Sequence, residues 1–586
     1  MTINEYYVQE LQALRTLGAE FSEKNPGLSS FLARKGQDPD VERLLEGFSF
    51  LTGRLRQYMG EELPEVSHTL AQLLWPNYLR PIPSYSILQY TPLLKAGRNK
   101  HISKGEEVQA VHSEDKINCV FRTCYDTEIL PLDIIKAHYY TSGEDSTIEL
   151  HFKTNDNVSL HDLNFNTLRF FIGDHEHVSN HLYLYLMNYV RDIEIIVKKE
   201  TATKTLQSNA ITPVGFAENE QILPIYKNVF HGYTLLQEYF CYIDKFHFID
   251  ISHLDVLKEF SEELLDRSYT FSIKINFTKK LQITKTITKA NFQLYCTPII
   301  NLFEAEAEPI KKGLEEEYEV IPGNMEYAQS EIYNVTNIHG WDSRINKYHK
   351  YLPFESFQHT KENIEYYYTR VKLSTDETRT KTYIRFNPAS ITSKDIYEDD
   401  VTISLDIQVT NRDLPSTLDL GDIHLTTSKS LISGVSFKNI TIPSKSYIPP
   451  IRGDFLWRIV SNMSLNYLAL DDIQTLRNIL EAYDFIGAND MIQKKHTESI
   501  LNGLVDISNT TSVMMLKGLP IRGIISELKL NSKKFSTLGE AYILSSILNE
   551  FFSLYCTTNS FHQLEVLVDQ KERFTWHARM GKQALM

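Results

Sequence analysis

The stretch from Val401 to Pro415, "VTISLDIQVTNRDLP", joins a strand pattern to a turn pattern. Apolar residues occupy every second position of its first half, which predicts a strand with one buried face. Asn411, Arg412 and Asp413 come next, and these residue types favour turns. A polar strand end could instead bind a partner or ligand, but because Pro415 also restricts the exit we favour the turn.

The same two-residue period continues outward along the chain. It predicts further strands at Thr147–Thr154, Leu168–Gly173, Tyr269–Phe277 and Thr382–Phe386. The chain from about Tyr85 to Pro450 should therefore be mostly β-structure. Charged runs usually lie in solvent, so we expect loops at Glu304–Glu319 and Thr375–Thr382, and a proline-rich linker at Pro443–Asp454.

Apolar residues at helical spacing predict helices at both ends of the chain. Asp38 and Pro39 suit the start of one N-terminal helix. Its expected buried stripe contains Val41, Leu44, Leu45, Phe48, Leu51, Leu55 and Tyr58. We expect this face, like the face of Leu456–Tyr467, to pack partly against other subunits. Three more helices are expected in the C-terminal part, at Leu456–Leu470, at Ile473–Tyr483 with Asp471 as the cap, and within Gly539–Phe561.

These patterns indicate a multidomain α+β protein with a helical N-terminal region, a β-rich middle and a helix-containing C-terminal region. We place the divisions at 1–84 (helical), 85–303 (β-rich with some helices), 304–450 (a second β-rich domain) and 451–586 (α+β).

Composition excludes several classes of protein. A formal charge of −15 and the lack of a basic cluster argue against nucleic acid as a partner. The five cysteines are scattered and never spaced C-x-x-C, which indicates neither a disulfide framework nor a zinc ribbon. Without a signal peptide or an apolar run of about 20 residues, we expect no membrane insertion and a cytoplasmic location.

The search for a reactive motif is negative. The sequence contains no Walker A, G-x-G-x-x-G, G-x-S-x-G or H-E-x-x-H pattern. His175, His177 and His181 could hold a metal if all were helical, but Ser179 or Asn180 is the expected helix cap, which would divide them. We therefore predict no catalytic, cofactor-binding or metal-binding residue.

Several motifs, in this order along the chain, resemble those of the TssF family of type VI secretion baseplate proteins. They include "LLWPNYLRPIPS" (Leu73–Ser84), "GFAENEQILP" (Gly215–Pro224), "LYCTPIINLF" (Leu294–Phe303), "TNRDLP" (Thr410–Pro415), "LWRIVSNMSLNYLAL" (Leu456–Leu470) and "LYCTTNSFHQL" (Leu554–Leu564).

The resemblance implies a structural subunit without catalytic residues or a cofactor. Proteins of this family form the wedge of a contractile-tail baseplate, in which two TssF copies embrace one TssG. The wedges surround the VgrG spike and contact TssK and TssE. The resemblance thus implies these partners for this chain, and a cytoplasmic baseplate anchored at the inner membrane.

The candidate partner-interface residues are Trp457, Arg458, Met463, Tyr467, Asn411, Arg412, Asp413 and Trp576. Two alternative functions remain. A phage-tail wedge protein would differ in genomic setting rather than in physics. An enzyme acting on carbohydrate would use two of the many carboxylates, whose spacing the sequence does not give.

Overall fold

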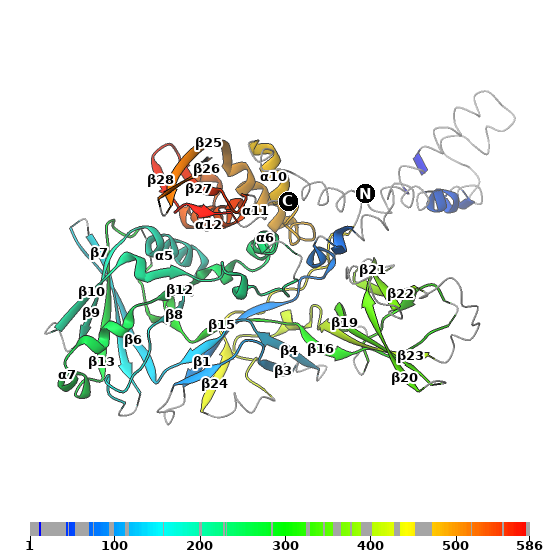
Figure 1. The fold of residues 1–586 in the computed structure, drawn as a ribbon, viewed down its shortest axis with the longest axis horizontal. Helices are drawn as coiled ribbons and strands as arrows, with labels where there is room; N and C mark the ends of the chain where they lie inside the picture. Colours follow the sequence, from blue (N-terminus) through cyan, green and yellow to red (C-terminus); the bar gives the residue numbers. More distant parts are fainter. Residues whose placement is uncertain are drawn as a thin grey trace. The chain divides into compact units, whose positions relative to one another are not determined.

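Figure 1 shows the computed structural model of the chain. The structure describes residues 7, 11–12, 43–44, 46–52, 70–73, 75–92, 99–111, 117–143, 145–155, 158–197, 202–226, 229, 231–282, 285–313, 315–323, 329–343, 346–354, 365–374, 378–387, 401–426, 434–451, 472–516, 518–553 and 556–581. The chain divides into two compact units. The first comprises Met1–Leu74 and Pro450–Ser464, and the second comprises Trp75–Pro449 and Leu465–Met586.

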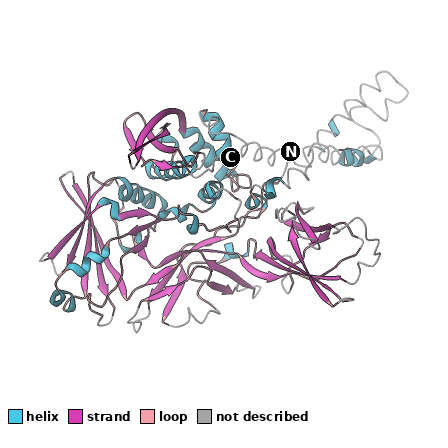
Figure 2. Cartoon of the chain, in the orientation of Figure 1, coloured by secondary structure: helices cyan, strands magenta, loops and turns pink. Residues whose placement is uncertain are grey.

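In the first unit, residues 43–44 and 46–52 are helical, as the apolar spacing predicts. The second unit is dominated by strands, and its helices lie both among the middle strands and in the C-terminal part (Figure 2). The predicted α+β class is therefore confirmed. Predicted strands are confirmed in the middle of the chain, where apolar alternation gives one buried face per strand.

The middle of the second unit contains four main sheets. One has the strand order β24 (Val435–Asn439), β1 (Tyr85–Pro92), β15 (Cys296–Ile300), β4 (Asn118–Thr123), β3 (Glu107–Val111). The next runs β10 (Ala202–Gln207), β9 (Val190–Val197), β13 (Thr270–Phe277), β7 (Asp145–Thr154), β6 (Leu132–Ser142). A smaller sheet runs β11 (Ile211–Pro213), β12 (Phe248–Ile251), β8 (Leu168–Phe171), β14 (Gln293–Leu294), and β2 (Lys100–Ile102) pairs with β5 (Thr127–Ile129).

The largest sheet is built around the quoted stretch. Its order is β16 (Phe303–Glu306), β23 (Val401–Thr410), β19 (Glu331–Asp342), β20 (Lys347–Pro353), β21 (Glu365–Leu373), β22 (Thr380–Asn387), β18 (Tyr318–Glu319), and β17 (Ile310–Lys311) also pairs with β23. The strand β23 pairs with β19 on one side and with β16 and β17 on the other. Its residues Ile403, Leu405, Ile407 and Val409 are buried, as the alternation predicts.

The C-terminal part combines a sheet with helices. Its strands run β25 (Leu504–Leu516), β26 (Leu519–Leu530), β27 (Phe561–Val568), β28 (Glu572–Thr575), and β29 (Arg579–Met580) also pairs with β27. The helix α12 (Leu538–Ser553) packs on α5 (Glu176–Asn188), α6 (His231–Cys241) and β27. Other α-helices that the structure describes in the second unit are α7 (Glu262–Asp266), α10 (Ile473–Glu481) and α11 (Met491–Gly503).

Short 3₁₀ turns connect these elements. They are η2 (Pro76–Leu79), η3 (Ser208–Ala210), η4 (Glu218–Glu220), η5 (Ile243–His247), η6 (Leu254–Glu259), η7 (Lys289–Asn291), η9 (Leu414–Thr417) and η11 (Ser532–Lys534). At η2, Trp75 packs against Tyr483 and Phe485, with ring centroids 5.0 and 6.0 Å apart. Aromatic contacts thus join residues that lie about 400 positions apart in the sequence.

Several local predictions are wrong. The acidic segment Glu304–Glu319 is not a loop throughout, because it contributes parts of β16, β17 and β18, and Thr380–Thr382 belongs to β22. The helix α5 begins at Glu176 with His175 as its N-cap, so neither Ser179 nor Asn180 caps it. For α10 the cap is Asp472, whose side chain accepts a hydrogen bond from the amide of Thr475. The final helix ends at Ser553, before Phe561 opens a strand.

Two sheets meet at a pair of buried asparagines. Asn301 lies between β15 and β16, where the chain passes from the sheet that contains β1 and β15 into the largest sheet. Asn411 follows β23. The backbone amide of Asn411 donates to Oδ1 of Asn301 at 2.6 Å, and Nδ2 of Asn301 donates to Oδ1 of Asn411 at 2.8 Å. Both residues are about 1% exposed or less.

The asparagine pair also holds the neighbouring strand β4. Nδ2 of Asn301 donates to the carbonyl of Val120 at 2.7 Å, and the amide of Val120 donates to Oδ1 of Asn411 at 3.2 Å. An asparagine side chain can both donate and accept, so each one satisfies backbone groups that would otherwise be buried without partners. The asparagine pair therefore fixes the largest sheet to the sheet that contains β1, β15 and β4.

Replacing Asn411 with Ala should destabilise this junction. A buried polar group left without a partner costs about 1–3 kcal/mol, and the change leaves the Val120 amide and one Asn301 N–H unsatisfied, so we expect a loss of roughly 2–3 kcal/mol in the free energy of unfolding. Urea denaturation, together with hydrogen exchange of the β4 and β23 amides, measures it. Asp413→Ala is the control, because Asp413 is exposed. Equal stability of the two variants would contradict the role of Asn411.

Candidate partner-binding surfaces

The predicted turn at Asn411–Pro415 is confirmed. Arg412 adopts a left-handed conformation with φ 54°, and the carbonyl of Asn411 accepts a hydrogen bond from the amide of Leu414 at 3.2 Å. Nη2 of Arg412 donates to the carbonyl of Thr378 at 3.2 Å. Asn411 is buried and used within the chain, whereas Arg412 is half-buried and Asp413 exposed. Of the three, only Arg412 and Asp413 present side chains toward solvent.

Trp576 lies in the C-terminal lobe, the part of the second unit that contains α10–α12 and β25–β29. Its ring stacks on Tyr542 of α12, with centroids 5.1 Å apart, and Tyr542 also contacts Phe574 at 5.2 Å. The indole is half-buried. The remaining candidates, Trp457, Arg458, Met463 and Tyr467, lie outside the described residues. A role of any candidate in an interface therefore stays a prediction.

The helix in the first unit exposes the apolar stripe that was expected to be buried. Leu44, Phe48 and Leu51 are 74%, 56% and 61% exposed, although they follow the i, i+4, i+7 spacing of one helical face. The other stripe residues, Val41, Leu45, Leu55 and Tyr58, lie outside the described residues. The prediction of burial within this chain is thus wrong for these three residues. An apolar helical face left in water is typical of a surface that binds a partner.

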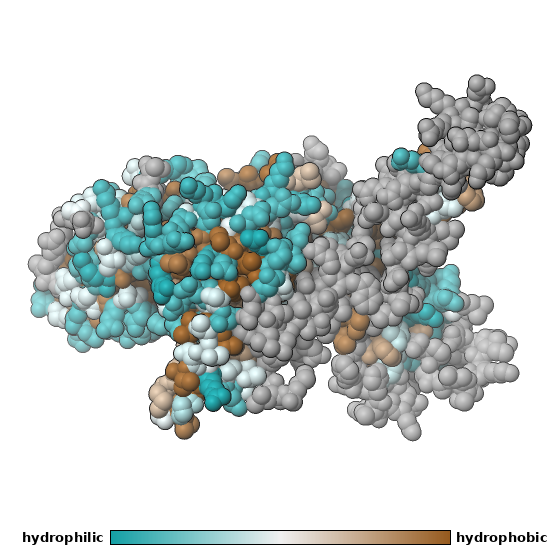
Figure 3. Space-filling view, turned by 90° about the horizontal axis from the view of Figure 1, so that it is seen from above, coloured by the Kyte–Doolittle hydropathy of each residue, from teal (hydrophilic) through white to brown (hydrophobic). Residues whose placement is uncertain are grey.

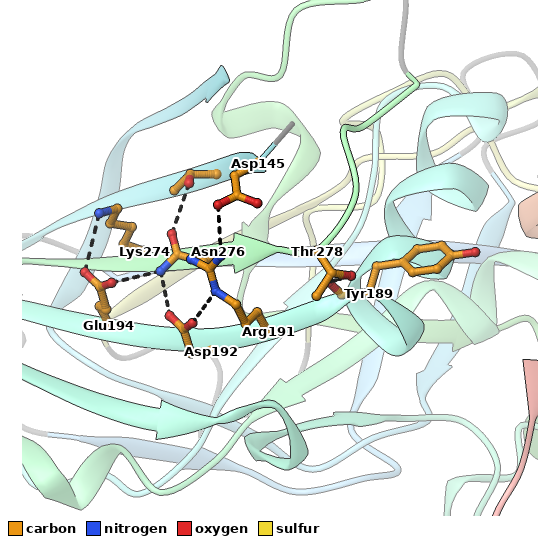
Figure 4. A network of polar contacts seen from close by, with 9 residues as sticks. Asp145, Tyr189, Arg191, Asp192, Glu194, Lys274, Asn276 and Thr278 are labelled. Atoms are coloured by element: carbon orange, nitrogen blue, oxygen red, sulfur yellow. Dashed lines mark hydrogen bonds and ion pairs between the residues drawn. The ribbon is translucent and has the colours of Figure 1, made fainter. Parts of the chain in front are cut away.

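A polar network covers one face of the sheet that contains β9 and β13 (Figure 4). Nδ2 of Asn276 lies between two carboxylates and donates to Asp192 at 2.6 Å and to Glu194 at 2.9 Å. Arg191 bridges Asp192 and Asp145, at 2.8 and 2.9 Å. Burial opposes the ionisation of Asp192, but the hydrogen bonds from Asn276 and Arg191 outweigh it and lower its pKa.

The carboxylates of this network are held by neighbouring side chains. Amide and guanidinium groups already compensate the carboxylates, as buried or half-buried charges require.

His177 and His181 both lie on α5. In the part of the chain that the structure describes, no group of three or more His, Cys, Asp or Glu residues is arranged to hold a metal ion.

A cavity of about 340 Å³ lies beside β8 and β12, and the motifs Gly215–Pro224 and Leu294–Phe303 both contribute to its lining. Its lining includes Arg169, which forms two 2.8 Å hydrogen bonds with Asp250. Lys104 donates to the carbonyls of Asn219 and Gln221, and burial lowers its pKa. Burial also raises the pKa of Cys296 well above its ordinary value, which disfavours the reactive thiolate. The cavity therefore offers paired charges and an inert thiol.

In the C-terminal lobe, an ion pair connects α11 to the start of α12. Nε2 of His496 lies 3.2 Å from Oε1 of Glu540, whose other oxygen accepts a hydrogen bond from the amide of Ser536 at 2.7 Å. Glu540 is fully buried. The hydrogen bond to Glu540 raises the pKa of His496 above its ordinary value, although burial opposes this.

The sign of this shift predicts how stability depends on pH. The pKa is higher in the folded state, so the contribution is complete below the unfolded value of about 6.5 and is lost as the pH rises through the folded value. Thermal unfolding of the chain at pH 6 and pH 8 should show that the wild type is less stable at pH 8. The difference in stability between the two pH values should be much smaller in His496→Ala. His577, which is exposed, provides the control substitution. An identical pH dependence in all three proteins would contradict the prediction.

Comparison with known proteins shows which family has this sequence and fold. A family model described as "Type VI secretion system, TssF" matches residues 1–583. The type VI secretion system component TssF1 of Pseudomonas aeruginosa is 25% identical over 632 aligned positions, covering 98% of each chain.

Solved structures agree with the family match. A chain in the cryo-electron microscopy structure of the type VI secretion system TssK-TssF-TssG baseplate subcomplex matches with a TM-score of 0.76 and 26% identity, covering 92% of this chain and 99% of that chain. A chain of the type VI secretion baseplate complex has the same fold, with a TM-score of 0.65, 23% identity and complete coverage of both chains. The chain therefore belongs to the TssF family and is a structural component of a type VI secretion baseplate.

Proposed function

We propose that this chain forms a wedge complex with TssG-type and TssK-type subunits and that it works without catalysis. Its similarity to a chain of a solved TssK-TssF-TssG baseplate subcomplex supports these two partners. A second copy of the chain, with two copies per TssG, and contacts with TssE and the VgrG spike belong to the same proposal. They rest on family resemblance alone.

The exposed stripe Leu44, Phe48 and Leu51 is the observation that carries the proposal. Burying a Leu or Phe side chain stabilises a complex by about 1.5–3 kcal/mol, so three of them on one helical face can contribute substantially to an interface. Obligate interfaces have this character, because they resemble a domain core divided between two chains. The stripe fits an apolar face of a helix on a partner.

Two observations favour a structural role over an enzyme acting on carbohydrate. The charged groups lining the cavity at Arg169 are held in internal contacts, and burial raises the pKa of Cys296, which disfavours its reactive thiolate form. Aromatic side chains are used for packing, as at Trp75 and Trp576.

No helix among the described residues is long and apolar enough to cross a membrane. We propose a cytoplasmic baseplate assembled against the inner membrane.

Co-expression with the TssG and TssK proteins of the same gene cluster tests the proposal. The wild-type chain should co-purify with them, and Leu44→Asp combined with Phe48→Asp should weaken binding to TssG at least tenfold, because a carboxylate cannot be buried there without a counter-charge. Arg43→Asp is the matched control, since it places the same charge on an already polar, exposed position of that helix.

Two results would contradict the proposal. One is a wild-type chain that binds neither TssG nor TssK. The other is turnover of a substrate by the isolated chain that a single side-chain substitution abolishes.

A further inference from the structure

The strands β25 and β26 form a hairpin that extends beyond its sheet. Residues Gly523–Leu530 of β26 pair with β27, but from Ser512 to Arg522 the described residues pair only across the hairpin. Gly523 marks the point where the hairpin leaves the sheet, since a Cβ there would lie 2.4 Å from the carbonyl oxygen of Phe561. The root is thus fixed closely against β27, and the described residues of the outer part have no neighbouring strand.

The outer part of the hairpin carries apolar side chains in solvent. Val513, Met515 and Leu519 are 60%, 68% and 68% exposed, and Leu516 is also exposed. Figure 3 shows that apolar side chains also reach the surface in patches among hydrophilic ones on the face that it draws. A two-stranded ribbon is only marginally stable by itself, and apolar clusters of this kind usually mark an interaction surface.

The charge of the hairpin restricts the chemistry of its partner. The outer part of the hairpin, from Ser512 to Arg522, contains no Asp or Glu and carries Lys517 and Arg522, in a chain with 75 acidic and 60 basic residues. Interface cores are enriched in Met and Arg and depleted in acidic residues. The complementary surface is therefore apolar, with carboxylates at its edge.

We infer that the hairpin tip, residues Ser512 to Arg522, inserts into an apolar groove edged by Asp and Glu on another baseplate subunit. This inference rests on the proposed function. Gly518, with φ 81°, adopts a left-handed conformation that suits a tight turn. The two methionines, Met514 and Met515, can adapt to the shape of a groove.

A lipid surface would also accept apolar and basic side chains, but the tip lacks the Trp and Tyr that typically anchor proteins at a membrane interface. A second copy of this acidic chain would also offer carboxylates to the basic tip, so self-association is measured as well. Both occupants are outcomes of the experiment.

The test measures binding of the purified full-length chain to purified TssG and TssK from the same gene cluster. Met515→Asp combined with Leu519→Asp should raise the dissociation constant for one of these subunits at least tenfold, and Arg522→Glu should weaken the same binding and reduce its dependence on salt. Ile492→Asp is the matched control, because Ile492 is an exposed apolar residue on α11, outside the hairpin. An unchanged melting temperature shows that the variants fold.

The outcomes separate this inference from the proposed function. If the wild-type chain binds neither subunit, the proposed function fails. If the wild type binds and the hairpin variants bind within twofold of it, only the inference about the hairpin is overturned. It is also overturned if the hairpin variants lose only self-association, measured by light scattering, or only binding to vesicles that contain anionic lipid.

Discussion

The exchange of hydrogen bonds between Asn301 and Asn411 is the constraint on which the architecture depends. Each residue follows a strand. The two residues are buried, and they form hydrogen bonds with each other and with the backbone amide and carbonyl of Val120. The two residues are 110 positions apart, so this contact closes a long segment of chain that includes most of the largest sheet. Because the contact is buried and directional, it fixes one orientation between two sheets that apolar packing alone would hold less specifically.

The structure uses its many aromatic residues largely for internal packing. Trp75 packs against Tyr483 and Phe485, and Trp576 packs on α12, so rings from distant parts of the sequence hold the second unit together. Apolar side chains that this packing leaves in water then become informative. They include those on the helix with Leu44 and on the hairpin of β25 and β26, and both of these groups fit a subunit that is completed by its partners.

The strands of the middle region could be predicted from sequence because a two-residue apolar period reports one buried face, as in β13 and β23. Edge strands could not be predicted in this way. The glutamates Glu317 and Glu319 suggested solvent, yet they form ion pairs with Lys372 on β21 and Lys381 on β22. The β25 hairpin was missed because Val513–Leu516 is a run of consecutive apolar residues, which lacks the alternation of apolar and polar types that indicates a strand with one buried face. The domain boundaries remain a prediction, although β24 and β1, from two predicted domains, share one sheet.

At the candidate surfaces, sequence identified the residue types but not their use. The turn at Asn411 was predictable from propensity, whereas its burial depends on Asn301, which no local pattern reveals. The exposure of Leu44, Phe48 and Leu51 was hidden for a similar reason, because an apolar stripe looks the same whether its partner is this chain or another.

The dependence of the sheet junction on the asparagine pair can be measured with a double-mutant cycle. The free energies of unfolding of Asn301→Ala, Asn411→Ala and the double variant give the coupling between the two side chains. Residues that share a buried hydrogen-bond network couple by about 0.5–3 kcal/mol, and we expect at least about 1 kcal/mol here. Additive effects, within about 0.3–0.5 kcal/mol, would show that the two residues act independently and that the sheets are held together by other contacts.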